Sequence, residues 1–355
     1  MKLKKLALAG AVALSATLSG NALAAERITV NIGSSHPTNN IWAWAMKNVF
    51  QPEVDRLLKE RGGNYTVRWR ESYGGTLYKF SDTRDAVSGG IVDVGMVGTV
   101  WESSTMPLQN VTYYTPFATT DHELLVDIFD KLTAEVPELR DSWTKQNMVH
   151  LSSLITDSYD IYANFPINSL DDLKNRRLNA PGTSANWLLG TGATPVDGAL
   201  TTYYTNIQTG VTHGTLSFAS GIGPSRVYEV APHLTRIGAG SMYFGSVAAN
   251  KRFFDKLPKQ VQEVFQEAGR ITSVRHAEHV TRTAESALAE MKKAGLKITD
   301  LSDAEKTRWV NSLPNIVEPW LEANGEPAKV VLRAYFDELR ARGVTPLRNW
   351  DEQVR

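Results

Sequence analysis

The sequence predicts an α/β protein with two lobes. Segments rich in β-forming residues alternate with helical segments, first in the N-terminal part of the chain and again in the middle. Residues 259–294 form one long amphipathic segment, with apolar side chains at three- and four-residue steps. A helix of that length can span two lobes, and a chain of 355 residues is long enough to form them.

The N-terminal segment has the features of a secretory signal peptide. Lysines at positions 2, 4 and 5 precede an apolar run over residues 6–14, and small residues follow at Ala22 and Ala24. We expect residues 1–25 to be a signal peptide, cleaved after Ala24 or Ala25. The apolar run is shorter than the ~20 residues that span a bilayer, which argues against an uncleaved membrane anchor.

The composition narrows the class of protein. The chain has no cysteine, so its stability depends on burial and not on disulfides. Its 38 basic and 38 acidic side chains balance, which gives no indication of a nucleic-acid partner. After the N-terminal segment, no apolar stretch approaches the length of a membrane span, so we expect no direct membrane insertion.

The N-terminal part alternates strand and helix. Residues 28–32 are predicted as a strand, residues 41–59 as a helix, residues 65–70 as a second strand, residues 82–88 as a helix and residues 91–97 as a third strand. Strands separated by helices of this length favour a parallel sheet with helices on both faces. In such sheets a ligand binds beyond the carboxyl ends of the strands.

The pattern resumes in the middle of the chain, with predicted strands at residues 150–155, 159–163 and 177–179. The long helix follows, and then a charged helical tail over residues 303–342, interrupted near Pro314 and Pro319. We therefore expect discontinuous lobes. Lobe I would comprise residues 26–155 and 242–285, and lobe II residues 156–241 and 286–355 with the C-terminal helices.

Motifs of catalysis are missing from the sequence. It has no Gly-x-Ser-x-Gly elbow, no His-Glu-x-x-His helix, no Walker lysine loop and no thiol nucleophile. His276 and His279 are spaced to share one helix face, but no third ligand completes a metal site, and solvated histidines are the favoured interpretation. Glycine clusters at 221–223 and 238–240 are interpreted as turns. We expect no enzyme activity, catalytic residue, metal or cofactor.

Three segments carry a family resemblance. Residues 172–181, 192–196 and 203–214 resemble the core signature of TRAP-type (DctP-like) substrate-binding proteins: a turn leading to a strand with proline, then Gly-Ala-x-Pro-Val, then a segment beginning with Tyr203. The resemblance extends upstream to residues 74–77 and 89–95. It also extends downstream to Asn250 and Leu257-Pro258, so it covers nearly all of the mature chain.

This resemblance implies a type II periplasmic-binding-protein-like fold, in which two lobes close over a small-molecule solute. It also implies a periplasmic location and docking on the permease subunits of a TRAP transporter. Closure requires a hinge and a site that touches both lobes, so that the ligand favours the closed state. We expect hinges near residues 154–159 and 240–246.

One position departs from the family pattern. Asn179 stands where the family carries an arginine that pairs with a ligand carboxylate. A neutral amide does not supply the charge that offsets desolvation of a carboxylate, so the substitution favours a ligand without one. A register shift of two residues would instead place Arg177 as an anion clamp. His213, at the usual aspartate position, is interpreted as a local packing change.

The other candidate ligand-binding residues are aromatic or acidic, a combination that suits a cation. We expect a small amine or amino alcohol, such as ethanolamine. For each residue taken alone, a place in the core or in a cap is at least as good an interpretation. The candidates are Trp42, Trp44, Tyr78, Trp101, Glu102, Asp157, Tyr159, Asn179, Phe218 and Tyr243.

Three alternatives stay open. The first is a binding protein of the same transporter class for an organic acid or sugar acid, held by Arg177 or by backbone amides. The second is a periplasmic hydrolase or lyase on the same α/β layers, since fold alone does not decide function. The third is a sensor that reports its ligand to a receptor.

Overall fold

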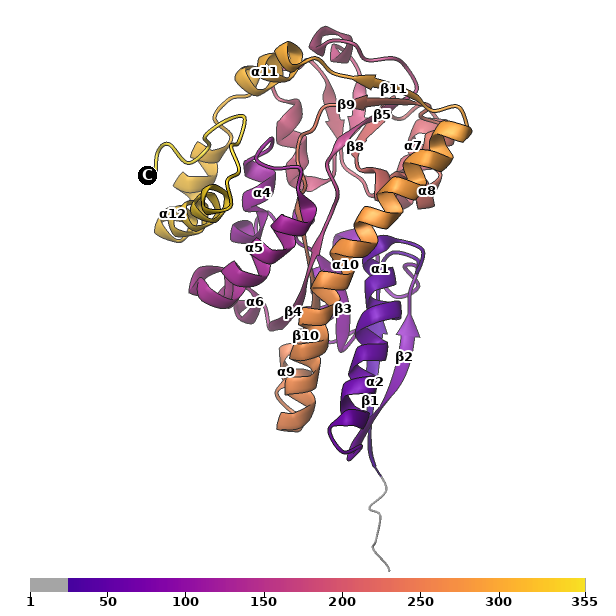
Figure 1. The fold of residues 1–355 in the computed structure, drawn as a ribbon, viewed down its shortest axis with the longest axis vertical. Coiled ribbons are helices and arrows are strands. Elements are labelled where there is room, and N and C mark those ends of the chain that lie inside the picture. Colours follow the sequence, from indigo (N-terminus) through magenta and orange to yellow (C-terminus); the bar gives the residue numbers. More distant parts are fainter. Residues whose placement is uncertain (1–24, 355) are drawn as a thin grey trace, which may run out of the picture.

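The computed structural model describes residues 25–354. Two β-sheets form the cores of two lobes, and the chain passes repeatedly between them (Figure 1). We call the part built on the five-stranded sheet lobe I and the part built on the six-stranded sheet lobe II. The predicted signal peptide, residues 1–25, lies outside the described residues except for Ala25. No helix within residues 25–354 is long and apolar enough to cross a membrane.

The sheet of lobe I is mixed and not wholly parallel. Strand β1 pairs in parallel with β2 and β3, as the alternation of strands and helices predicts, but β10 is antiparallel to both of its neighbours, β3 and β4. The third strand begins later than predicted, because residues 91–93 form a bend. In spatial order the strands are β2 (Tyr65–Ser72), β1 (Glu26–Gly33), β3 (Val94–Gly98), β10 (Tyr243–Asn250) and β4 (Met148–Ile155).

The predicted helix over residues 41–59 is confirmed as an unbroken helical run with one π-helical turn. Asn40 begins it, and its side chain accepts hydrogen bonds from the backbone N–H groups of Trp42 and Ala43. The helical segments up to residue 145 are α1 (Ile41–Ala45), η1 (Met46–Phe50), α2 (Gln51–Glu60), η2 (Phe80–Asp82), α3 (Thr83–Ser88), η3 (Thr99–Trp101), η4 (Pro107–Asn110), α4 (Val111–Tyr114), α5 (His122–Glu135) and α6 (Pro137–Lys145).

Lobe II has a mixed sheet of shorter strands. Strands β6, β7 and β8 are parallel where they pair, whereas β5 is antiparallel to both β8 and β9. In spatial order the strands are β11 (Lys297–Asp300), β9 (His233–Arg236), β5 (Asp160–Ala163), β8 (Gly214–Ser217), β6 (Arg177–Asn179) and β7 (Thr194–Val196). The helical segments between them are η5 (Leu170–Leu173), η6 (Gly182–Leu188), α7 (Leu200–Gln208), α8 (Ala219–Ser225) and η7 (Val227–Glu229).

Two extended segments join the sheets, residues 156–159 from β4 to β5 and residues 237–242 from β9 to β10. They lie side by side and exchange backbone hydrogen bonds. The N–H of Thr156 donates to the carbonyl of Met242 at 3.0 Å, and the N–H of Tyr159 donates to the carbonyl of Gly240 at 2.9 Å. We call these two segments the crossing strands. They coincide with the segments where we expect the hinge.

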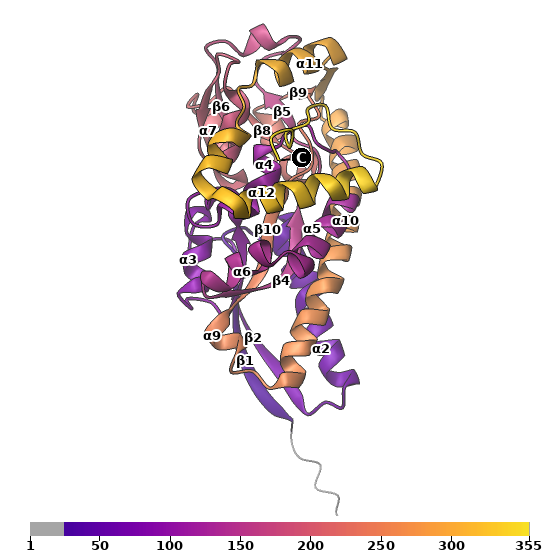
Figure 2. The ribbon, with the colours of Figure 1, turned by 90° about the vertical axis from the view of Figure 1, so that its left-hand side faces the viewer.

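The long helix is confirmed as α10 (Lys259–Lys293), after the short α9 (Lys251–Phe254). It packs on β4, α2 and α5 of lobe I and on α8 of lobe II, so it spans both lobes (Figures 1 and 2). At ~1.5 Å per residue, its 35 residues extend about 50 Å. The helix thus forms a third connection beside the two crossing strands.

The C-terminal tail differs from its prediction in two respects. Helices α11 (Asp303–Ser312) and α12 (Val317–Ala341) are separated at Pro314, but Pro319 lies in the first turn of α12 and the kink occurs at Gly325. Helix α12 packs against η4, α4, α5 and α6 (Figure 2). We therefore propose to count α12 with lobe I, although the sequence placed the whole tail in lobe II.

Candidate functional site

The lobes enclose a small cavity where β1, β3, β6 and β8 end, at the carboxyl ends of strands from both sheets. Its lining side chains nearly fill it, and the cavity volume is about 10 Å³. Lobe I and lobe II both contribute to its wall, and Tyr159 enters from a crossing strand. The lining residues are His36, Trp42, Val100, Trp101, Tyr159, Pro181, Ala199, Leu200, Tyr203, Ser217, Phe218 and Phe244.

The lobe I wall is a stack of aromatic rings. Trp42 lies parallel to Phe244, and Trp101 meets the edge of Phe244 at 5.6 Å between ring centroids. The indole N–H of Trp42 donates to the carbonyl of Ile155 at 3.0 Å, which fixes the ring. Gly98 makes room for the stack, because a Cβ at this position would lie 2.4 Å from the Trp101 ring.

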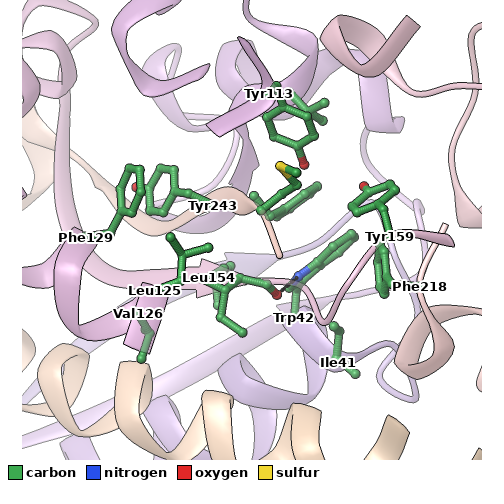
Figure 3. Close-up of a cluster of buried hydrophobic side chains, with 14 of the residues drawn as sticks. Ile41, Trp42, Tyr113, Leu125, Val126, Phe129, Leu154, Tyr159, Phe218 and Tyr243 are labelled. Atoms are coloured by element: carbon green, nitrogen blue, oxygen red, sulfur yellow. Dashed lines mark hydrogen bonds between the residues drawn. The ribbon is translucent and has the colours of Figure 1, made fainter. Parts of the chain in front are cut away.

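The lobe II wall is also aromatic. The rings of Tyr159 and Phe218 lie 5.1 Å apart, edge to face, and Phe218 faces Trp42 across the cavity at 5.8 Å. Figure 3 shows Trp42, Tyr159 and Phe218 next to one another. Because rings from both lobes meet here, a solute in the cavity touches both lobes at once.

Three polar atoms in this wall have no hydrogen-bond partner among the described residues: His36 Nε2, Trp101 Nε1 and Ser217 Oγ. Burial lowers the pKa of His36 to about 4, so its imidazole is neutral at pH 7. Its other nitrogen, Nδ1, lies 3.0 Å from Ser35 Oγ. Within residues 25–354, no Asp, Glu, Lys or Arg lines the cavity. The site therefore offers neutral hydrogen-bonding groups between aromatic faces.

An outer cleft of about 400 Å³ adjoins the cavity and shares His36 and Leu200 with it. Its wall combines apolar surface with neutral polar residues, Asn40 and Thr201 among them. The side chain of Asn39 donates from lobe I to the carbonyl of Pro224 in lobe II at 3.3 Å. The cleft thus lies between the two lobes, next to the cavity.

Four of the residues predicted from the sequence line the cavity together: Trp42, Trp101, Tyr159 and Phe218. Tyr203 and Ser217 were not predicted. His36 and Phe244 lie in segments that the sequence favours for the cleft, residues 36–40 and 243–244, but they are not among the ten candidates. Phe244 had a detectable signal, because neighbouring strand residues point to opposite faces and only one of Tyr243 and Phe244 can face the cavity. Tyr243 faces the other way and stacks on Phe129 at 4.1 Å (Figure 3).

Three further candidates lie elsewhere in lobe I. Trp44 stacks on His279 of α10 with ring centroids 3.5 Å apart. Tyr78 is buried against the backbone of β1 and β3. Glu102 forms an ion pair with Arg84 at 2.8 Å. None of the three lines the cavity.

Neither Asn179 nor the possible anion clamp Arg177 lines the cavity. Asn179 is fully buried inside lobe II, where its Nδ2 donates to Thr212 Oγ1 at 2.9 Å and its Oδ1 accepts from Asn206 at 2.9 Å. The guanidinium of Arg177 donates to the carbonyls of Val211 and Gly210, both at 2.7 Å, on the exposed surface. Both side chains are already engaged in holding strands and turns of lobe II.

Asp157 caps a helix turn, which was the alternative interpretation of this residue. Its carboxylate accepts from the backbone N–H of Ala219 at 2.9 Å and from both the backbone and the hydroxyl of Ser220. Burial raises its pKa to about 6. The residue ties a crossing strand to the turn that carries Phe218, so it supports the cavity wall without being one of the residues that line it.

The expectation of two solvated histidines is wrong for His276, whereas His279 is half-buried. His276 is fully buried, and its Nε2 lies 3.1 Å from the backbone N–H of Ile155. His279 is covered by the stacked Trp44. Within the described chain, no three His, Asp or Glu side chains are grouped to hold a metal ion.

Comparisons with known proteins agree with this architecture. Residues 34–323 match the family described as bacterial extracellular solute-binding protein, family 7 (DctP). The ectoine-binding periplasmic protein TeaA of Halomonas elongata is 23% identical over 274 residues, which cover 75% of this chain and 79% of TeaA. The ectoine/5-hydroxyectoine-binding periplasmic protein UehA of Ruegeria pomeroyi is 21% identical over 339 residues, covering 93% of this chain and 99% of UehA.

The fold matches a solved receptor as well. The crystal structure of DctP6, a Bordetella pertussis extracytoplasmic solute receptor binding pyroglutamic acid, has a TM-score of 0.77 at 21% identity, covering 87% of this chain and 100% of that chain. The two-lobed fold with a long spanning helix is thus confirmed. Since the family match extends over most of the described residues, this chain belongs to bacterial extracellular solute-binding protein family 7, the DctP family of TRAP-transporter periplasmic solute-binding proteins, which bind solutes and are not enzymes.

Proposed function

We propose that this protein captures a compact carboxylate-bearing solute that also carries a positive or planar group, and delivers it in the periplasm to the permease subunits of a TRAP transporter. The observation that carries this proposal is the cavity itself. Aromatic rings from both lobes surround three unpaired polar atoms, and no charged side chain among the described residues lines the space.

The volume indicates lobes that already lie against each other. The cavity volume is about 10 Å³, roughly what a single water needs, whereas pockets for drug-sized molecules typically measure ~300–1,000 Å³. Any solute therefore needs the lobes to stand farther apart than they do here, and a compact solute needs a smaller movement than a longer sugar acid.

The electrostatics favour a solute without net charge. An isolated carboxylate or ammonium in a closed apolar cavity loses its hydration, and this cavity has no counter-charge to offset the loss. A zwitterion brings its own counter-charge. Its cation can lie against the Trp42 and Phe218 faces, while His36, Trp101 and Ser217 donate hydrogen bonds to its carboxylate.

The relatives support the carboxylate, and the two ectoine-binding proteins also support the cation. TeaA and UehA are named for ectoine, and DctP6 is described with pyroglutamic acid. Both ligands are small rings that carry a carboxylate, and ectoine also carries a delocalised cation. These comparisons support a carboxylate-bearing solute better than the small amine, such as ethanolamine, that the replacement of the family arginine by Asn179 suggested.

The connections between the lobes support closure about a hinge. The crossing strands and α10 join the lobes beside the cavity, and the cavity wall is complete only when the lobes are together. A solute that contacts both walls binds the closed form better and shifts the population toward it. The permease would then recognise the closed, loaded form.

A thermal-shift screen of the chain from Glu26 onward tests the proposal. The panel contains ectoine, 5-hydroxyectoine, pyroglutamate, galactonate and ethanolamine. A ligand at about 100 times its Kd adds ~2.7 kcal/mol of stability. We expect stabilisation by a ring carboxylate and none by ethanolamine. Stabilisation by ethanolamine alone would contradict the proposal and restore the amine hypothesis.

A further inference from the structure

We propose that Gly182 selects solutes by size, because it sets how closely the two lobes approach at the cavity. This inference deepens the proposed function and rests on it. Gly182 follows Pro181 at the end of β6 in lobe II, and it faces Val100 in the segment that follows β3 in lobe I. Pro181, Val100 and the adjacent Trp101 all line the cavity.

The contact at Gly182 is made by backbone on backbone. A Cβ built on Gly182 would lie 2.1 Å from the carbonyl oxygen of Val100, 2.8 Å from its carbonyl carbon and 3.4 Å from the Cα of Trp101. Side-chain atoms could rotate away from such a contact, but a carbonyl group cannot. An added methyl group therefore moves one lobe relative to the other.

Hydrogen bonds on either side hold the loop in this position. The N–H of Gly182 donates to Asp197 Oδ1 within lobe II at 2.8 Å. The next residue, Thr183, donates from its hydroxyl to Asn110 Oδ1 in lobe I at 3.0 Å. The backbone of Gly182 is also in the left-handed region, with φ of +47°, which favours glycine over any other residue. The loop thus has little freedom to accommodate a side chain by local movement.

The contact between Gly182 and Val100 therefore limits how far the lobes can close, and this limit sets the size of the closed cavity. With glycine at 182, the wall formed by Pro181 comes so close to Val100 and Trp101 that the closed cavity keeps a volume of only about 10 Å³, and the closed lobes fit most tightly around a compact solute. With alanine, the lobes stop earlier and the closed cavity is larger. A compact solute then loses contact with one wall, while a larger one gains room.

The test compares Gly182→Ala with Gly210→Ala. Gly210 also lies in lobe II and has φ of +75°, but a Cβ built on it meets nothing within 4 Å, so it controls for backbone strain without the contact. Calorimetric titration gives the Kd of each variant for ectoine, as the compact probe, and for galactonate, as the larger one. Overpacking typically costs enough to change a binding constant by about tenfold. We expect the ratio of the galactonate Kd to the ectoine Kd to fall about tenfold in Gly182→Ala alone.

Two results would overturn the inference while leaving the proposed function intact. One is an unchanged ratio in Gly182→Ala, and the other is an equal change in Gly210→Ala. If the wild-type protein binds neither probe, the spacing of the lobes is measured directly, whatever the outcome of the ligand screen. The chain has no cysteine, so spin labels on Arg70→Cys in lobe I and Thr205→Cys in lobe II report that distance. If Gly182 limits how closely the lobes approach, the shortest label-to-label distances seen in the wild type should be missing from Gly182→Ala. Identical distance distributions in the two proteins would refute the inference.

Discussion

The indole of Trp42 and the ring of Phe244 lie almost parallel, with centroids 3.5 Å apart and an interplanar angle of 6°. This pair joins the first helix of the chain to strand β10, which is about 200 residues away along the chain. Since Trp42 also donates to Ile155 at the start of a crossing strand, the aromatic wall and the hinge are mechanically connected. Phe218 of lobe II lies against this same wall, 5.8 Å from Trp42 between ring centroids.

Removal of one hydrogen-bond donor should weaken binding of a carboxylate-bearing solute. Trp101→Phe keeps a ring against Phe244 but deletes the unpaired Nε1. A hydrogen bond to a charged group contributes ~1.5–3 kcal/mol, so we expect the Kd to rise about tenfold or more. Trp44→Phe is the control, because Trp44 stacks on His279 away from the cavity. Equal losses in both variants would contradict a role for Trp101 in the site.

Arg177→Gln tests the anion-clamp hypothesis. The guanidinium donates to two carbonyls of the turn at Gly210 and Val211 and lies outside the cavity. We therefore expect a small loss of stability and an unchanged Kd in calorimetric titration. A Kd for carboxylates that rises tenfold, with none of that effect for uncharged ligands, would show that Arg177 reaches the solute after all.

Asn179→Ala should affect stability and not binding. The amide makes hydrogen bonds to Thr212, Gly214 and Asn206 inside lobe II, and its loss leaves buried polar groups without partners. Such a loss typically costs ~1–3 kcal/mol per group. Urea unfolding should show this decrease, while the Kd measured at a temperature where the variant is folded stays the same. A stable variant with a changed Kd would place Asn179 back in the site.

Two buried groups near the crossing strands, His276 and Asp160, should change the free energy of unfolding in opposite directions as the pH falls. Burial lowers the pKa of His276 to about 3. In the unfolded chain this histidine is protonated below about pH 6.5, whereas in the folded protein it stays neutral until the pH nears 3. Its contribution to stability is lost as the pH falls from 7 toward 3. Burial raises the pKa of Asp160 to about 7, well above the ~3.9 of the unfolded chain, so its contribution becomes more favourable as the pH falls from 7 toward 4.

Urea unfolding of His276→Gln and Asp160→Asn between about pH 8 and pH 5 measures both effects. The free energy of unfolding of His276→Gln, relative to wild type, should rise as the pH falls. The corresponding difference for Asp160→Asn should fall over the same range. Differences that do not change with pH would mean that neither group titrates as its burial requires.

Periodicity in the sequence predicts most of the elements but not how the sheets are assembled. The strands of the N-terminal part, the helix after Asn40 and the long α10 follow from local patterns of apolar residues. Strand β10 does not, because its partners β3 and β4 are distant in the sequence and only the tertiary structure makes it antiparallel to both. The position of α12 on lobe I is likewise set by packing of the whole chain.

The sequence also predicts only part of the site, because the direction of a side chain depends on the tertiary structure. Aromatic composition indicates a cavity wall, but the direction of each side chain decides which residues form it. Trp42 and Trp44 lie in the same short helix, and only Trp42 faces the cavity. The sequence position of Asn179 in the family motif suggested contact with the ligand, whereas its hydrogen bonds turn it into the interior of lobe II.

The most direct test is a crystal structure of the chain from Glu26 onward with the solute that stabilises it most in the screen. We expect density for a compact solute between Trp42 and Phe218, with a carboxylate oxygen within hydrogen-bonding distance of His36 Nε2, Trp101 Nε1 or Ser217 Oγ. Density in another groove, such as the one between Tyr114 and Asn186 on the outer surface, with the inter-lobe cavity filled only by water, would contradict the assignment of the site.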